Sequence, residues 1–158
     1  MFNLERFIPR DETILFLFGI SLRYVVVSVT LWTLFLGGLA LYFLELQEES
    51  FLAQVLLILL VIIIVLYIIR FLTTAYFLTE NKIYKVTGLG FQRVTSAKKS
   101  EIDDMKVVQG FLERLLFNTG TIKFNTPGSA GFEIILPRVG DPYETKQNIY
   151  DVWDEPTP

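Results

Sequence analysis

The chain has 158 residues, a formal net charge of −3, and hydrophobic residues at more than half of its positions. It contains no cysteine and no histidine, which excludes disulfide bonds, thiolate metal sites and the commonest general base. The length allows one compact domain plus anchoring segments, and the small negative charge gives no reason to expect a nucleic-acid partner.

The first segment, residues 1–23, is apolar in its second half. Pro9 and the charged residues that follow it indicate a turn. The next stretch, "TILFLFGI", is apolar but too short to cross a bilayer. We therefore expect residues 12–22 either to form a helix at the cytoplasmic membrane surface or to extend the helix that follows.

Two long uncharged stretches predict a pair of transmembrane helices, over residues 24–44 and 51–72. Each stretch is about 20 residues long, which is enough for a helix to cross a hydrocarbon core of about 30 Å. A chain this short could not bury two such helices in protein, so a soluble helical core is the weaker alternative. Residues 45–50, "ELQEES", form the short loop between the helices.

The basic residues near the two helices predict the orientation in the membrane. The loop at 45–50 holds no lysine or arginine, and the positive-inside rule then places both termini in the cytoplasm and this loop outside the cell membrane. The basic residues lie before the first helix and after the second: Arg6, Arg10, Arg23, Arg70, Lys82 and Lys85.

The first long helix carries small or hydroxyl-bearing residues at a spacing of three and four, which places them on one face. Such a face lets helices approach closely in lipid. We expect it to pack against the second helix or to contact another subunit. No ionisable group lies at membrane depth, which argues against a transport pathway. The residues of this face are Thr30, Thr33, Gly37 and Ala40.

After Thr73 the pattern changes to short alternating runs separated by turn signals, which is typical of antiparallel strands. We expect six or seven strands, arranged as a small barrel or sandwich. The candidate strands are "TAYFLT", "KIYKVT", "FQRVTSAKK", "MKVVQGF", "TIKFNT" and "FEIIL".

The end of the chain predicts a helix. Asp141 is a good N-cap, Pro142 suits the first helical position, and Glu144 completes a capping box. An apolar stripe follows at helical spacing, and we expect it to plug the open end of the barrel. The cytoplasmic domain would then cover residues 73–154, with 155–158 as a tail. The stripe consists of Thr145, Ile149, Val152 and Trp153.

Three motifs carry a family resemblance: "AYFLTENKI" after the second helix, the run Arg114–Ile122, and the pair Asp141–Pro142. With them the chain resembles the membrane-flanked, bacterial-type pleckstrin-homology (PH) family of prokaryotic membrane proteins. Asn118 stands where that family more often has glycine. The resemblance implies a two-helix membrane hairpin followed by a mainly-β PH-like barrel of six to seven antiparallel strands, closed by a C-terminal helix.

The sequence gives little support for catalysis. The adjacent carboxylates Asp103 and Asp104 would point to opposite faces of a strand, so their spacing does not make a catalytic dyad. The "GLG" at 88–90 is followed by no lysine–threonine pair and no helix, so it is not a phosphate-binding loop. We expect a protein that is not an enzyme and that holds neither a cofactor nor a metal ion.

Two surfaces are candidates for binding. The apolar run "GFLERLLF" either packs onto the domain or the lipid surface, or docks a partner protein, through Phe111, Leu112, Leu115 and Leu116. The basic residues Lys82, Lys85 and Arg93 would contact lipid headgroups. After Thr73, however, ten basic residues are balanced by eleven acidic ones, which argues against a strong electrostatic sensor.

The leading hypothesis is therefore a membrane-tethered interaction or scaffolding module for another membrane or membrane-associated protein. Tethering itself favours this role, because it raises the effective concentration of partners in the same membrane. A sensor of membrane lipid is the first alternative, and an accessory subunit of a membrane complex is the second. A second copy of the chain is a further candidate partner.

Overall fold

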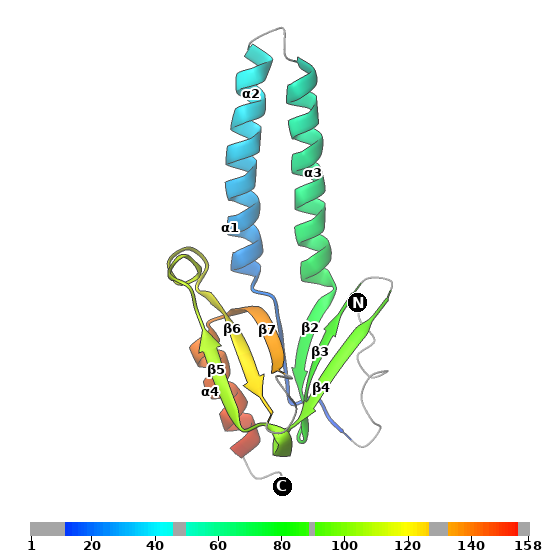
Figure 1. The fold of residues 1–158 in the computed structure, drawn as a ribbon, viewed down its shortest axis with the longest axis vertical. Coiled ribbons are helices and arrows are strands. Elements are labelled where there is room, and N and C mark those ends of the chain that lie inside the picture. Colours follow the sequence, from blue (N-terminus) through cyan, green and yellow to red (C-terminus); the bar gives the residue numbers. More distant parts are fainter. Residues whose placement is uncertain (1–11, 46–49, 89–90, 127–132, 155–158) are drawn as a thin grey trace.

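The computed structural model describes residues 12–45, 50–88, 91–126 and 133–154. Two long helices stand side by side on a domain made of two β-sheets and one shorter helix (Figure 1). The chain enters the helices from the domain and returns to it, so both helices are joined to the same end of the domain. We call this the helix-bearing end.

The first rod consists of α1 (Leu22–Trp32), a π-helical segment η2 (Thr33–Gly37) and α2 (Gly38–Glu45). The second rod is α3 (Ser50–Leu72). Both rods are long and apolar enough to cross a membrane, judged by length and composition, and little of either is buried within the protein. The helices predicted over 24–44 and 51–72 are confirmed as helices.

A strand precedes the first helix, where the sequence led us to expect a helix. Residues 12–22 neither form a surface helix nor extend α1 over their full length, because β1 (Phe16–Gly19) pairs antiparallel with β2 (Thr74–Leu78). Phe16 and Phe18 pack against the core, whereas Leu17 between them is exposed. This period of two is that of a half-buried strand, and a short apolar run does not reveal it unambiguously.

The strands form two antiparallel sheets rather than a closed barrel. One sheet has the order β1-β2-β3-β4 and the other β5-β6-β7. The strands not yet given are β3 (Lys82–Thr87), β4 (Arg93–Lys98), β5 (Asp104–Val108), β6 (Thr119–Asn125) and β7 (Glu133–Gly140). The described part of the chain therefore has six strands after Thr73, and β1 is a seventh.

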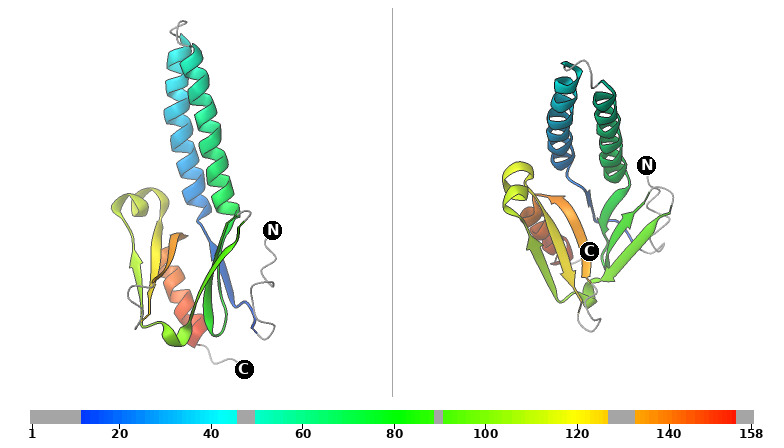
Figure 2. Two further views of the ribbon diagram at one scale, coloured as in Figure 1. Left: turned by 45° about the vertical axis from the view of Figure 1, so that its right-hand side comes forward. Right: turned by 45° about the horizontal axis from the view of Figure 1, so that its top comes forward.

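The two sheets meet where β1 runs past β7. Ile20 forms an isolated bridge with Val139, and the backbone N–H of Ser21 donates to the Arg138 carbonyl at 2.9 Å. On the opposite side β4 and β5 are the outer strands of their sheets, and the chain passes between them through a 3-10 turn (Lys99–Glu101). The sheets diverge in Figure 2, which explains why the expected barrel is not closed.

The last helix, α4 (Pro142–Asp154), starts at the proline as predicted and packs against the three-stranded sheet. The side chains of Thr145, Ile149 and Trp153 are buried, so most of the predicted apolar stripe faces the core. The Trp153 Nε1–H also donates to the Thr79 carbonyl at 3.2 Å. Because Thr79 directly follows β2, this bond also links the end of α4 to the four-stranded sheet.

Asp141 differs from the expected N-cap in its backbone. Its φ is +41°, in the left-handed region, whereas an N-cap residue is usually extended. Its carboxylate accepts a hydrogen bond from the side-chain amide of Asn118, which is also left-handed at φ +49°. Asn118 and Asp141 thus join the start of β6 to the start of α4. An asparagine at position 118 suits this conformation almost as well as the glycine of the related motif.

Candidate functional site

The helix-bearing end is built on the β1–β2 pair. Gly19 lies opposite Ala75 at the end of this pair, and the two strands continue into α1 and from α3. The Ile69 carbonyl, near the end of α3, accepts hydrogen bonds from the Thr73 hydroxyl at 2.7 Å and from the Thr73 backbone N–H at 2.9 Å. The two helices therefore leave the domain as the direct continuation of neighbouring strands (Figure 1).

The apolar turn between β5 and β6 lies at the same end. The four residues proposed from the sequence are together on one helical turn and are exposed: Phe111 by 79%, Leu112 by 62%, Leu115 by 62% and Leu116 by 37%. A turn packed into the domain would have buried them, so that alternative is wrong.

This turn contacts α1 through its last residue. The ring of Phe117 lies 5.1 Å from the ring of Tyr24, measured between centroids, and Tyr24 is in the first turn of α1. Figure 1 shows the turn beside the lower end of the helix. The four exposed side chains are thus held next to the point where α1 leaves the domain.

A second apolar tip lies on the β3–β4 connection. Thr87 at the end of β3 pairs with Thr74, and the Gly88 N–H donates to the Thr73 carbonyl at 3.1 Å, which places this connection beside the end of α3. Phe91 on this connection is 97% exposed. Sequence reasoning missed Phe91 because it was assigned to a strand.

The three basic residues proposed to contact headgroups do not form a cluster. Lys82 lies at the start of β3, remote from the helices, and its Nζ is 3.2 Å from a Glu12 carboxylate oxygen. Lys85 donates from Nζ to the Ile135 carbonyl at 2.6 Å, and burial lowers its pKa. Arg93 is exposed and lies at the helix-bearing end, opposite Thr87. Lys82 and Lys85 lie at different points along β3, and Arg93 lies on β4. The three charges are therefore spread along the sheet.

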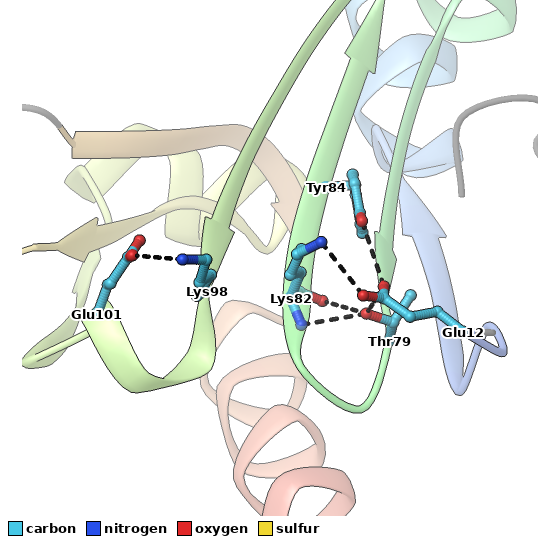
Figure 3. A network of polar contacts seen from close by, with 6 residues as sticks. All are labelled: Glu12, Thr79, Lys82, Tyr84, Lys98 and Glu101. Carbon is cyan, nitrogen blue, oxygen red and sulfur yellow. Dashed lines mark hydrogen bonds and ion pairs between the residues drawn. The ribbon is translucent and has the colours of Figure 1, made fainter. Parts of the chain in front are cut away.

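Glu12 is the centre of a polar network at the far end of the domain (Figure 3). Its carboxylate accepts hydrogen bonds from the Thr79 hydroxyl at 2.8 Å and the Tyr84 hydroxyl at 3.2 Å. Burial raises the pKa of Glu12, but the bonds from Thr79 and Lys82, together with the Lys82 charge, lower it below its ordinary value. This network ties the residues before β1 to the β2–β3 hairpin, which is a structural use of Lys82.

A cavity of about 260 Å³ lies between the two helices at the helix-bearing end. Two arginines line this cavity, and most of its other lining residues are apolar. The Arg138 backbone has a φ of +60°, and its guanidinium lies 4.7 Å over the Tyr24 ring. The lining residues are Ile20, Tyr24, Val25, Trp32, Ile63, Leu66, Tyr67, Arg70 and Arg138. Sequence reasoning used Arg70 only for orientation and did not single out Arg138.

The predicted small-residue face is only partly a helix–helix contact. Ala40 is buried in the helix pair, whereas Thr30 and Thr33 are exposed and donate their hydroxyls to the Val26 and Val29 carbonyls. A Cβ added to Gly37 would meet nothing within 4 Å. The residues buried on the first rod are Val25, Ser28, Leu36 and Ala40.

The described residues offer no group of three or more acidic side chains that could hold a metal ion. Of the adjacent carboxylates considered in the sequence, Asp104 lies 3.9 Å from Lys106 in an exposed pair. The arrangement at the helix-bearing end is instead one of apolar tips around a cavity with two cations. Such a surface supplies apolar contact area and positive charge, and both suit binding.

The chain was compared with family models, curated proteins and solved structures. A family model described as "Bacterial PH domain" matches residues 16–152, a range that begins with β1 and includes both long helices and nearly all of α4. No curated protein and no solved structure matches the chain.

Proposed function

The chain belongs to the bacterial PH domain family, and on this premise we propose that it is a non-catalytic membrane protein. Its helix pair crosses the cell membrane, and its PH-like domain works at the membrane surface as an interaction module. The observation that carries this proposal is that the exposed apolar turn after β5 lies at the helix-bearing end, against α1.

The surface of the helix pair supports insertion into lipid. Large apolar side chains are exposed along both rods, among them Leu34, Phe51 and Ile58. In water each such side chain would forgo about 1.5–3 kcal/mol of burial free energy. In hydrocarbon the same side chains are solvated, and the helical backbone satisfies its own polar groups.

The charges near the helix ends support a cytoplasmic domain. Arg23 lies in the first turn of α1 and Arg70 in the last turn of α3, both at the helix-bearing end. The connecting loop predicted at residues 45–50 has no lysine or arginine in its sequence. The positive-inside rule then favours this loop outside the cell and both termini inside.

In this orientation the apolar turn reaches the lipid interface. Phe111, Leu112 and Leu115 project from a turn that Phe117 fixes against α1, and Phe91 projects beside α3. Aromatic and aliphatic side chains partition favourably into the boundary between headgroups and acyl chains. The domain would therefore be held on the membrane at three places: the helix pair and the two apolar tips.

A scaffolding role is the second candidate, and the outer strands favour it. β4 and β5 are each paired on one side only within the sheets described, and Val94 of β4 is exposed. An extended segment of another membrane-associated protein can add to such an edge through backbone hydrogen bonds. This role uses a different surface from the lipid contact, so the two are separable by experiment.

The absence of cysteine from the sequence provides a clean test of the membrane arrangement. We expect Glu48→Cys to react with a membrane-impermeant maleimide in intact cells, and Asp151→Cys to react only after lysis. Labelling of Asp151→Cys in intact cells would reverse the orientation. Recovery of the chain in the soluble fraction would overturn the whole proposal.

Spin labels at single cysteines distinguish lipid contact from protein contact. A label at Leu115→Cys should be more accessible to oxygen than to a water-soluble nickel chelate, whereas the label at Asp151→Cys should show the opposite preference. A photoreactive group at Val94 tests the scaffold role. A protein adduct at Val94 would establish it, and a preference for the nickel chelate at Leu115 would remove the lipid contact.

A further inference from the structure

We propose that the cavity between the two helices binds an anionic phospholipid, with the phosphate at Arg70 and Arg138 and the first part of an acyl chain along the helices. This inference rests on the proposed membrane arrangement. It assigns a ligand class to a cavity that neither the apolar turn nor the strand edges use.

The residues that line the cavity extend along both helices, and their chemistry differs between its two ends. Ile63 lies seven residues before Arg70 on α3, which corresponds to about 10 Å of helix. Trp32 lies at a similar distance from Tyr24 on α1. The arginines thus lie at the helix-bearing end of the cavity, and apolar side chains line the part that extends between the helices.

The two arginines are available for an anion. Among the described residues, no carboxylate oxygen forms an ion pair with Arg70 or Arg138. The guanidinium of Arg138 lies over the face of Tyr24, and this stacking leaves the N–H donors at its edge free to point sideways. Guanidinium groups match phosphate oxygens in a bidentate geometry.

Two phenols lie close to the arginines. The rings of Tyr24 and Tyr67 are 5.9 Å apart, and both line the cavity. Their hydroxyls can donate hydrogen bonds to phosphate or ester oxygens. In the proposed arrangement this end lies at the level of the headgroups, where basic pockets between transmembrane helices bind anionic lipid.

The apolar part of the cavity favours a lipid over a free phosphate ion. Inorganic phosphate would use only the arginine end and leave the space beside Val25, Ile63 and Leu66 without a partner. An acyl chain fills that space with methylene groups, whose burial away from water is favourable. The phosphate and the chain together match both ends of the cavity.

Native mass spectrometry of the full chain in detergent tests the proposal. The number of lipids retained is counted while phosphatidylglycerol or phosphatidylcholine is titrated, with and without millimolar inorganic phosphate. The test variant is Arg70→Gln with Arg138→Asn, because asparagine tolerates the left-handed backbone of position 138. The matched control is Arg23→Gln with Arg93→Gln, which removes the same charge near the same end.

We expect one tightly held phosphatidylglycerol, a loss of roughly 30-fold in its affinity in the test variant, and little change in the control. An equal loss in both variants would show that general electrostatics, rather than the cavity, holds the lipid. Displacement of the lipid by inorganic phosphate would reduce the cavity to an anion site. Equal retention of phosphatidylcholine would overturn the role of the arginines.

A second variant tests the apolar part without changing charge. Ile63→Trp should fill the space between the helices and weaken phosphatidylglycerol retention while leaving the arginines in place. Maleimide labelling of Glu48→Cys in the same variants reports whether the helices still cross the membrane. Normal labelling without selective lipid retention would sink the lipid site and leave the membrane arrangement standing, whereas lost labelling would sink the arrangement itself.

Discussion

Gly19 faces Ala75 across neighbouring antiparallel strands, although both long helices lie between these residues in the chain. The helix pair therefore takes the place of a hairpin turn between β1 and β2. A Cβ added to Gly19 would lie 3.3 Å from the Thr74 carbonyl oxygen, so the two strands are close where the helices begin. The domain accordingly includes residues before the helices and is not confined to residues 73–154.

The first prediction is that a turn can replace the helices. Joining Ile20 to Thr74 through Asn-Gly should give a soluble domain, because this dipeptide suits the two-residue turns that connect antiparallel strands. We expect one cooperative unfolding transition in urea, followed by circular dichroism. The fragment 73–158, which lacks β1, should show no such transition, because the core around Tyr76 would lose the strand that covers it.

Two neighbouring residues of β1 give the second prediction. Phe18 packs on the core with its ring 5.6 Å from that of Tyr76, whereas Leu17 is exposed. In the domain without helices, Phe18→Ala should lower the free energy of unfolding by about 2 kcal/mol, since the ring is partly buried. Leu17→Ala should change it by less than about 0.5 kcal/mol. Equal effects would mean that β1 does not pair as described.

The sequence predicts most of the fold because the strands after Thr73 alternate clearly and α4 begins with an aspartate–proline pair. It does not predict β1, since an apolar run of eight residues before a long apolar helix fits a helix as well as a strand. The sequence also does not predict the cavity that we propose to bind lipid. Arg70 and Arg138 come together only because β7 passes beside α1. The left-handed backbone of residue 138 also cannot be inferred from the sequence, because the residue there is an arginine.

Among the residues proposed for binding, the sequence likewise predicts some relationships and not others. Leu112, Leu115 and Leu116 are grouped correctly because they share one helical turn, which is local in sequence. Lys82 and Lys85 also share a strand, but their partners, Glu12 and the Ile135 carbonyl, come from distant segments. A positive charge near a turn therefore says little about its use until the neighbouring strands are known.

The third prediction concerns Gly120, which has an ordinary φ but little space. A Cβ at this position would lie 2.9 Å from Pro142 Cγ and 3.1 Å from the Val108 carbonyl oxygen. Gly120→Ala should therefore push α4 away from β6 and cost about 1–3 kcal/mol of unfolding free energy. The matched control is Gly110→Ala, whose Cβ would meet only the Glu113 side chain, at 3.6 Å. Urea unfolding of both variants checks this steric account, and a neutral Gly120→Ala would refute it.

The fourth prediction is a pH dependence that originates at Glu12. The hydrogen bonds and the Lys82 charge lower the pKa of Glu12 in the folded state, although burial alone raises it. The folded state therefore binds the proton more weakly than the unfolded state, whose glutamate pKa is about 4.3. The stability from this group is complete above about pH 5 and is lost as pH falls through the folded pKa.

Urea unfolding at several pH values tests this effect by difference. At neutral pH the free energy of unfolding of Glu12→Gln should be lower than that of the unsubstituted protein. The two free energies should converge as the pH is lowered below about 4. Glu101→Gln serves as the control, because its pair with Lys98 is more than half exposed on both sides and such pairs contribute little. A constant difference between Glu12→Gln and the parent at all pH values would show that the carboxylate charge is not what the network uses.

The fifth prediction is that the apolar tips alone bind membranes. Once the domain without helices is shown to unfold cooperatively, its binding to phosphatidylcholine liposomes can be measured by co-sedimentation. Phe91→Ser and Leu115→Ser should each weaken binding about tenfold, because each removes an exposed apolar side chain that the interface would bury. Tyr150→Ser on α4, which is less exposed and lies away from both tips, is the control.

Added salt should leave this binding nearly unchanged, since apolar contacts are not screened by ions. A steep loss of binding with salt would instead point to exposed cations such as Arg93, and would favour the electrostatic sensor over the apolar contact.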